Sequence, residues 1–85
     1  MIHDNFERQS LNSKPVENVP GVEQLKDEFN EKKFTKAYHL LGQYLLLNKD
    51  NDLFDEWLKT DFPSMTAENR SQCIDSLFNW TNNNL

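Results

Sequence analysis

The residues of this chain best suited to hold a metal ion form one polar run near its middle, Asn48-Lys49-Asp50-Asn51-Asp52. Their side-chain oxygens fall at alternate positions, as in a calcium loop, but such a loop also requires glycine at its sixth position and glutamate at its twelfth. Counted from Asn48, these positions hold Leu53 and Lys59. The run therefore predicts a helix-capping turn rather than a metal site.

The residues that could support catalysis are one cysteine, Cys73, and two histidines, His3 and His39. A catalytic cysteine needs a histidine within hydrogen-bond reach, but Cys73 falls within an apolar helical stripe and His39 on a polar helix face. The acidic pairs Asp27-Glu28 and Asp55-Glu56 lie on exposed faces, whereas acid–base catalysis requires carboxyl groups in a desolvated cleft. We therefore expect no enzyme activity and no cofactor.

The chain has 85 residues, enough for one domain, and a net charge of −5 at pH 7 with a pI near 4.8. Binding to nucleic acid or to anionic membranes relies on Lys and Arg, so this charge argues against both as partners. No segment has the pattern of a secretory signal or the length of apolar sequence that spans a bilayer. The sequence therefore predicts a cytoplasmic protein whose partner is a protein, one with a basic surface being the best electrostatic match.

The pattern of apolar residues predicts an all-α domain of four helices at about 20–31, 35–48, 52–60 and 67–81. Pro20 suits a first helical turn, and Pro63 ends the third helix. The expected N-caps are Thr35 for the second helix, Asn51 or Asp52 for the third, and Thr66 or alternatively Ser64 for the fourth. Residues 1–19 are expected to form a flexible or loosely docked arm, 20–81 the helical domain, and 82–85 a frayed tail. No segment alternates as a strand does.

The segment from Phe34 to Asn48 is apolar over about half of a helical circumference, which is wide for a helix in so small a protein. We expect it to be the central helix of the domain, contacting the other three. The predicted core consists of Leu25, Phe29, Phe34, Ala37, Leu41, Leu45, Phe54, Leu58, Ile74, Leu77 and Phe78.

The last two predicted helices are joined by a short linker and have lengths suited to a helix-turn-helix motif. A recognition helix should offer Arg, Lys, Asn or Gln to base edges and basic residues to phosphates. The last helix begins Ala67-Glu68-Asn69-Arg70-Ser71-Gln72, with one arginine and one glutamate, and the helix before it is mainly acidic. A nucleic-acid-binding regulator of this type is the alternative hypothesis for function.

The stretch KFTKAYHLLGQYLLLNKDN resembles the second helix of a tetratricopeptide repeat. Phe34 and Ala37 match its aromatic and small positions, and Leu41 stands where a large residue is usual. Tyr44 and Lys49 depart from the pattern, and no second copy of the repeat follows. What the resemblance implies is a pair of packed helices.

Several apolar residues do not fit a core closed by one chain, among them Leu46 on the polar side of the central helix and Trp80 at the edge of the last stripe. Together they favour an exposed apolar patch that binds a partner. The residues expected in this patch are Tyr38, Tyr44, Leu46, Leu47, Trp57 and Trp80. A second copy in a symmetric homodimer, the arm of the same chain or a foreign partner could each cover it.

The function that these observations favour is that of a small acidic protein-binding module. It would act by surface contact, as an adaptor, inhibitor or regulatory subunit, and without catalysis. The acidity of the chain would steer it towards a basic partner surface.

Overall fold

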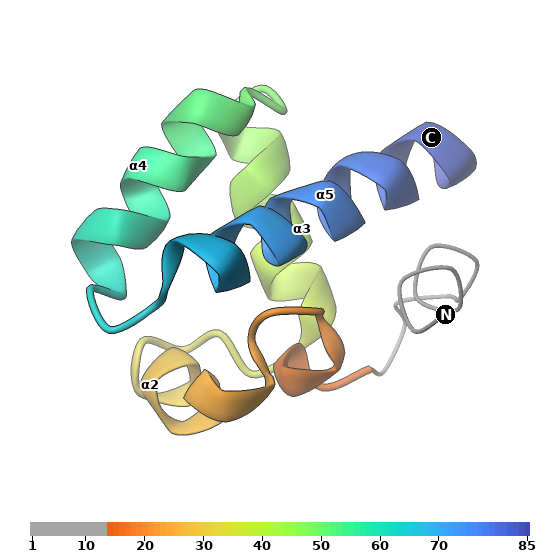
Figure 1. Cartoon of the computed structure of the whole chain (residues 1–85). Helices are drawn as coiled ribbons and strands as arrows, with labels where there is room; N and C mark the ends of the chain where they lie inside the picture. The colour runs from red at the N-terminus through yellow and green to blue at the C-terminus, as the bar shows by residue number, and fades with distance from the viewer. Residues whose placement is uncertain (1–13) are drawn as a thin grey trace.

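The computed structural model describes residues 14–85. These residues form four α-helices and two short 3-10 helices, joined by turns and short loops. In chain order they are η1 (Val16–Asn18), η2 (Glu23–Leu25), α2 (Lys26–Glu31), α3 (Ala37–Leu46), α4 (Asn51–Asp61) and α5 (Ala67–Asn84). The predicted all-α class with four helices is confirmed. The η1–η2 segment and α2 lie at one end of the molecule, below α4 and α5 in Figure 1.

Side-chain caps explain where α4 and α5 begin. The Asp50 carboxylate accepts hydrogen bonds from the backbone N–H groups of Asp52 and Leu53, at 3.0 and 3.1 Å, so Asp50 caps α4 in place of the expected Asn51 or Asp52. The Thr66 hydroxyl accepts from the N–H of Asn69 at 3.1 Å, as predicted. Each cap satisfies backbone donors that have no partner within the helix. The N-cap of α3 is Lys36 and not the expected Thr35.

Stacked aromatic rings occupy the centre of the core. Phe29 of α2 and Phe62, just after α4, stack face to face with ring centroids 3.8 Å apart. Phe34 and Trp57 pack against Phe62 at larger angles, so rings from three parts of the chain meet in one cluster. Such contacts supply apolar burial that a short chain with few aliphatic residues needs.

The buried face of α3 is rotated from the predicted one. Leu40 and Tyr44 are fully buried, whereas Leu45 is 39% exposed. Phe78 of α5, also predicted as core, is 41% exposed. The apolar surface of α3 is wider than the part that its neighbours within residues 14–85 cover, and the sequence pattern does not reveal which part that will be.

The described part of the predicted arm is docked onto the domain. Val16 and Val19 are fully buried, and η1 packs closely against α3. The Val16 N–H donates to the Thr35 carbonyl at 3.0 Å, and the Ala37 N–H donates to the Lys14 carbonyl at 2.9 Å. The rest of the predicted arm, 1–13, lies outside the described residues.

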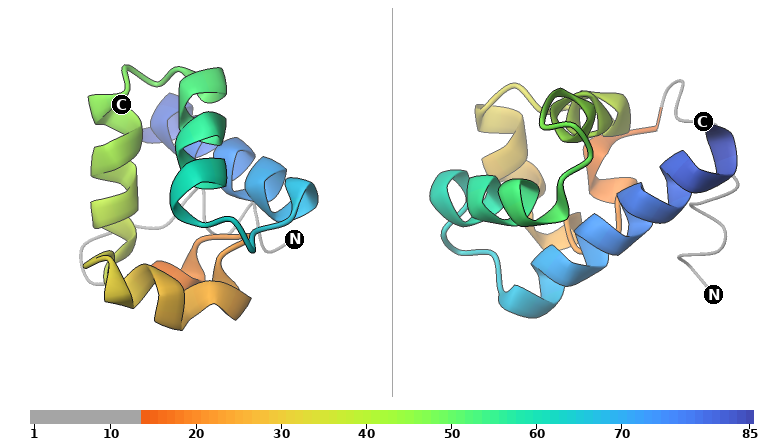
Figure 2. Two further views of the ribbon diagram at one scale, coloured as in Figure 1. Left: turned by 90° about the vertical axis from the view of Figure 1, so that its left-hand side faces the viewer. Right: turned by 90° about the horizontal axis from the view of Figure 1, so that it is seen from above.

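The C-terminal helix runs to Asn84 and includes most of the segment expected to be frayed. It packs along α4, and the two views in Figure 2 show these helices side by side. Within residues 14–85, none of the helices is long and apolar enough to cross a membrane.

Candidate functional site

A tight hairpin, Val19–Val22, joins η1 to η2. The Val19 N–H donates to the Val16 carbonyl at 3.0 Å, and the Val22 N–H donates to the Val19 carbonyl at 3.1 Å. Gly21 has φ of +88°, a conformation that residues with a side chain rarely adopt. Pro20 and Gly21 thus reverse the chain between two short helices, forming a helix–hairpin–helix unit. The sequence-based prediction had placed Pro20 in the first turn of one continuous helix.

Gly21 also fixes the hairpin to α5. A Cβ atom at Gly21 would collide with the backbone carbonyl oxygen of Asn69 and would lie 3.2 Å from the backbone nitrogen of Cys73. Only glycine allows this approach of two backbones, independently of its φ angle. The hairpin and the first turns of α5 therefore form one rigid surface.

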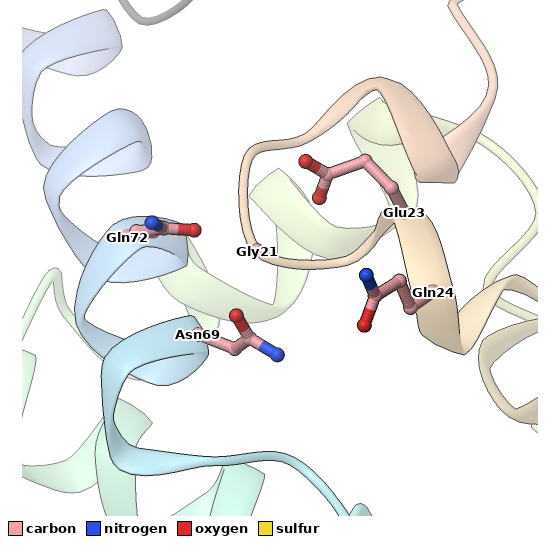
Figure 3. A pocket seen from close by; sticks show the side chains of 5 residues that line it. All are labelled: Gly21, Glu23, Gln24, Asn69 and Gln72. Carbon is pink, nitrogen blue, oxygen red and sulfur yellow. The ribbon is translucent and has the colours of Figure 1, made fainter.

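A polar hollow of about 170 Å³ lies between the hairpin and α5, lined by Gly21, Glu23, Gln24, Asn69 and Gln72. Figure 3 shows the four side chains around it, with Glu23 and Gln24 facing Asn69 and Gln72 across the gap. Within residues 14–85, no partner holds any of these side chains by a hydrogen bond or ion pair. The hollow thus offers three amides and one carboxylate to a ligand.

The backbone of the hairpin and of the η2 residues that follow it offers further donors, which we call the hairpin N–H groups. The N–H groups of Gly21, Glu23 and Gln24 have no hydrogen-bond acceptor in the described part of the chain. Backbone N–H groups of this kind, close together and presented by a rigid turn, bind the oxygens of phosphate groups.

The charges around the hairpin have both signs. Lys26 forms an ion pair with Glu17 at 3.8 Å, so these two charges offset each other beside η1. An isolated β-bridge between Pro15 and Lys36 brings the backbones of Lys14 and Lys36 close together. Neither lysine has an acidic partner for its ammonium group within residues 14–85. Two lysines without an acidic partner thus lie close together along the backbone next to η1.

Cys73 is not a nucleophile. It is fully buried, and burial, together with the charge of Glu23, raises the pKa of its thiol. A thiol that stays protonated is unreactive. In the described residues, no group of three or more His, Cys, Asp or Glu side chains could hold a metal ion.

The predicted partner-binding residues separate into two groups. Tyr38 (45% exposed) and Leu46 (74% exposed) lie on one outer face of α3, together with Leu45. Gly42 lies between them in helical register, and a Cβ there would have no neighbour within 4 Å, so this face is open to close approach. We call Tyr38, Gly42, Leu45 and Leu46 the α3 face.

The other predicted partner residues are wholly or partly enclosed. Tyr44 is fully buried, contrary to expectation, and its hydroxyl donates to the Asn51 side-chain oxygen at 2.6 Å. Desolvation, and secondarily the charge of Asp50, raises the pKa of Tyr44. Leu47, Trp57 and Trp80 are half-buried and pack against the core.

The helix-turn-helix interpretation of α4 and α5 does not fit the geometry. Arg70, the single arginine of α5, donates through Nε to Asp55 at 2.8 Å and through a second guanidinium nitrogen to the Met65 carbonyl at 3.1 Å. The arginine that would have contacted DNA instead holds α5 against α4.

Comparison with known proteins identifies the family. The model of the barrier to autointegration factor family matches residues 1–84. The human barrier-to-autointegration factor is 40% identical over 79 residues, covering 92% of this chain and 88% of the relative. Barrier-to-autointegration factor A of Xenopus laevis is 40% identical, and the Drosophila melanogaster protein 34%, each over 92% of this chain and 87% of the relative.

These matches correct several expectations. Proteins of this family bind DNA as homodimers, through a helix–hairpin–helix, and also bind LEM-domain proteins; they are nuclear and chromatin-associated, with a cytoplasmic pool. The predicted protein-binding module or inhibitor, its cytoplasmic location and the preference for a protein partner with a basic surface over nucleic acid are therefore wrong. The family agrees better with the alternative hypothesis of a nucleic-acid-binding regulator, with a helix–hairpin–helix in place of the expected helix-turn-helix. The expectation of no enzyme activity is confirmed, because the family is non-catalytic. By the extent of both kinds of match, this chain belongs to the barrier-to-autointegration factor family.

Proposed function

We propose that this chain is a DNA-binding protein that contacts the phosphate backbone of a duplex through its Val19–Val22 hairpin and acts as a homodimer. Membership of a family of dimeric DNA-binding proteins is the observation that carries the proposal. Three features of the described residues support it: the free hairpin N–H groups, the lysines beside η1 and the exposed α3 face.

The hairpin suits phosphate because its donors are fixed in advance. Gly21, Glu23 and Gln24 present N–H groups from a turn that is held by its own hydrogen bonds and by contact with α5. Preorganised donors bind without the entropic cost of ordering a loop. Contacts from the backbone to phosphate carry no sequence information, so we expect binding to DNA with little base preference.

Lys14 and Lys36 provide positive charge beside η1 although the chain as a whole is acidic. Each phosphate neutralised by a lysine releases counterions, so the affinity should fall as salt rises. With two such lysines, the expected dependence on salt is shallow compared with that of strongly basic DNA-binding proteins.

The α3 face supports the homodimer. Leu46 and Leu45 expose apolar surface beside Tyr38, and Gly42 allows a second helix to approach closely. In a symmetric dimer the same face is buried on both copies. Two hairpins on one dimer would bind one DNA molecule, or bridge two, with greater avidity than either hairpin alone.

Fluorescence anisotropy with a labelled duplex tests DNA binding. Gln24→Glu places a negative charge at the exposed edge of the hairpin and should weaken binding about three- to tenfold at low salt, because it repels phosphate. Asn83→Asp makes the same change of charge near the far end of α5 and serves as the control. Absence of binding by the wild-type protein at low salt, or equal effects of the two variants, would contradict the proposal.

A further inference from the structure

Glu23 is the one carboxylate among the five residues that line the hollow between the hairpin and α5. Its backbone N–H is one of the free hairpin donors, so the same residue presents a phosphate-binding group and a phosphate-repelling group. The negative charge of Glu23 also acts on the buried thiol of Cys73 on α5, because it helps to raise the pKa of that thiol. The side chain is exposed and has no cationic partner within residues 14–85 that would neutralise it.

The other side chains around the hollow are neutral amides. Gln24, Asn69 and Gln72 can each donate two N–H bonds to phosphate or sugar oxygens, and Asn69 and Gln72 are already half-buried and held by α5. The hollow therefore has the donors to extend the hairpin contact along a DNA backbone, with one opposing charge at its centre.

We propose that Glu23 limits the affinity of this chain for DNA and that the amides of the hollow form an additional contact to the sugar–phosphate backbone. The inference rests on the proposed function and concerns the same site. At close range in water, a unit charge facing a phosphate changes affinity by about three- to tenfold, and salt screens the effect. Glu23 makes the chain a weak binder that is readily displaced from DNA.

Glu23→Gln tests the charge and retains the size of the side chain. We expect it to tighten binding of a labelled duplex about three- to tenfold at about 50 mM salt and less at about 200 mM. Glu31→Gln is the matched control, since Glu31 is an exposed carboxylate at the C-terminal end of α2, away from the hollow, and it should have little effect. Equal tightening by both variants would overturn the inference, because net charge alone would then explain it.

The amide contact is tested in the Glu23→Gln background, where binding is strongest. Adding Gln72→Ala should return at least half of the gain in binding free energy, whereas adding Gln43→Ala on α3 should return none. No effect of Gln72→Ala would overturn the role of the hollow.

Failure of the inference can be told apart from failure of the proposed function. Wild-type protein that binds DNA with the same affinity as Glu23→Gln would overturn the inference and leave DNA binding intact. Glu23→Gln that binds where wild-type protein does not would support the inference and show that the wild-type chain does not act on DNA by itself. Absence of binding by both proteins would overturn both proposals.

Discussion

Two fully buried residues of this protein, Cys73 and Tyr44, each carry a polar group into the core. Cys73 was correctly expected to be a buried hydrophobe, because its place within an apolar stripe is visible in the sequence. Tyr44 was expected at a partner surface, yet it is buried with its hydroxyl on Asn51. Periodicity places a residue on one side of a helix, but the hydrogen-bond partner that makes burial of a hydroxyl possible lies on another element and is not predictable from spacing.

The buried thiol makes the stability of the domain depend on pH. Burial raises the pKa of Cys73 in the folded state, so above the ordinary thiol pKa of about 8.5 only the unfolded chain loses this proton. The unfolded state then binds fewer protons, and the free energy of unfolding should fall by up to about 1.4 kcal/mol per pH unit. Urea denaturation between pH 8 and about pH 10 measures the slope. Cys73→Ala should flatten it, and an unchanged slope would show that other groups cause it.

At the scale of elements, the sequence predicted α4 and α5 well and the N-terminal unit poorly. The caps and apolar stripes of α4 and α5 are local signals in the sequence, and Thr66 caps α5 as predicted. The hairpin was missed because Pro20 also suits a helix start, and the decisive contact, between the backbones of Gly21 and Asn69, joins residues far apart in sequence. Val16 and Val19 on one side of Pro20-Gly21 and Leu25 on the other were the available signal for two short helices around a turn.

The two glycines of this chain give a matched test of the hairpin. Gly21→Ala should destabilise the domain by about 1–3 kcal/mol, since alanine is strained at this φ and its Cβ meets the Asn69 carbonyl. Gly42→Ala should keep or raise the stability of dilute protein by up to about 1 kcal/mol, because its Cβ meets nothing and alanine favours helix. Urea denaturation of both variants decides. Equal stabilities would show that the hairpin is not docked onto α5.

At the scale of the whole molecule, net charge was misleading. A charge of −5 argues against a surface of Lys and Arg, but a hairpin that binds phosphate through backbone N–H groups needs few such residues. Net charge does not show where free N–H groups lie close together, so the hairpin could be proposed as the interface only from the fold and the family. Of the six residues predicted in the apolar patch, Tyr38 and Leu46 are exposed together on the α3 face, and their role in binding a partner stays a prediction.

Sedimentation at micromolar concentration tests the α3 face. Wild-type protein should sediment as a dimer, and Leu46→Lys should sediment as a folded monomer, since it places a charge in the proposed apolar interface. Leu85→Lys is the control, because Leu85 is just as exposed but lies at the end of the chain. If the wild-type protein is a monomer, or if the Leu46→Lys variant is still a dimer, the α3 face is not the dimer interface.

The central claim, that the hairpin is the DNA-binding surface, is tested most directly by NMR titration of the ¹⁵N-labelled protein with a short duplex at low salt. Direct contact should shift the amide signals of Gly21, Glu23 and Gln24 most, followed by those of Asn69 and Gln72 across the hollow. A second hollow lies between α4 and α5 and is lined in part by Asp52, Asp55 and Asp75. The amide signals of these residues should stay in place, because their carboxylates repel phosphate. Shifts concentrated in that second hollow, or no shifts at the hairpin, would contradict the account.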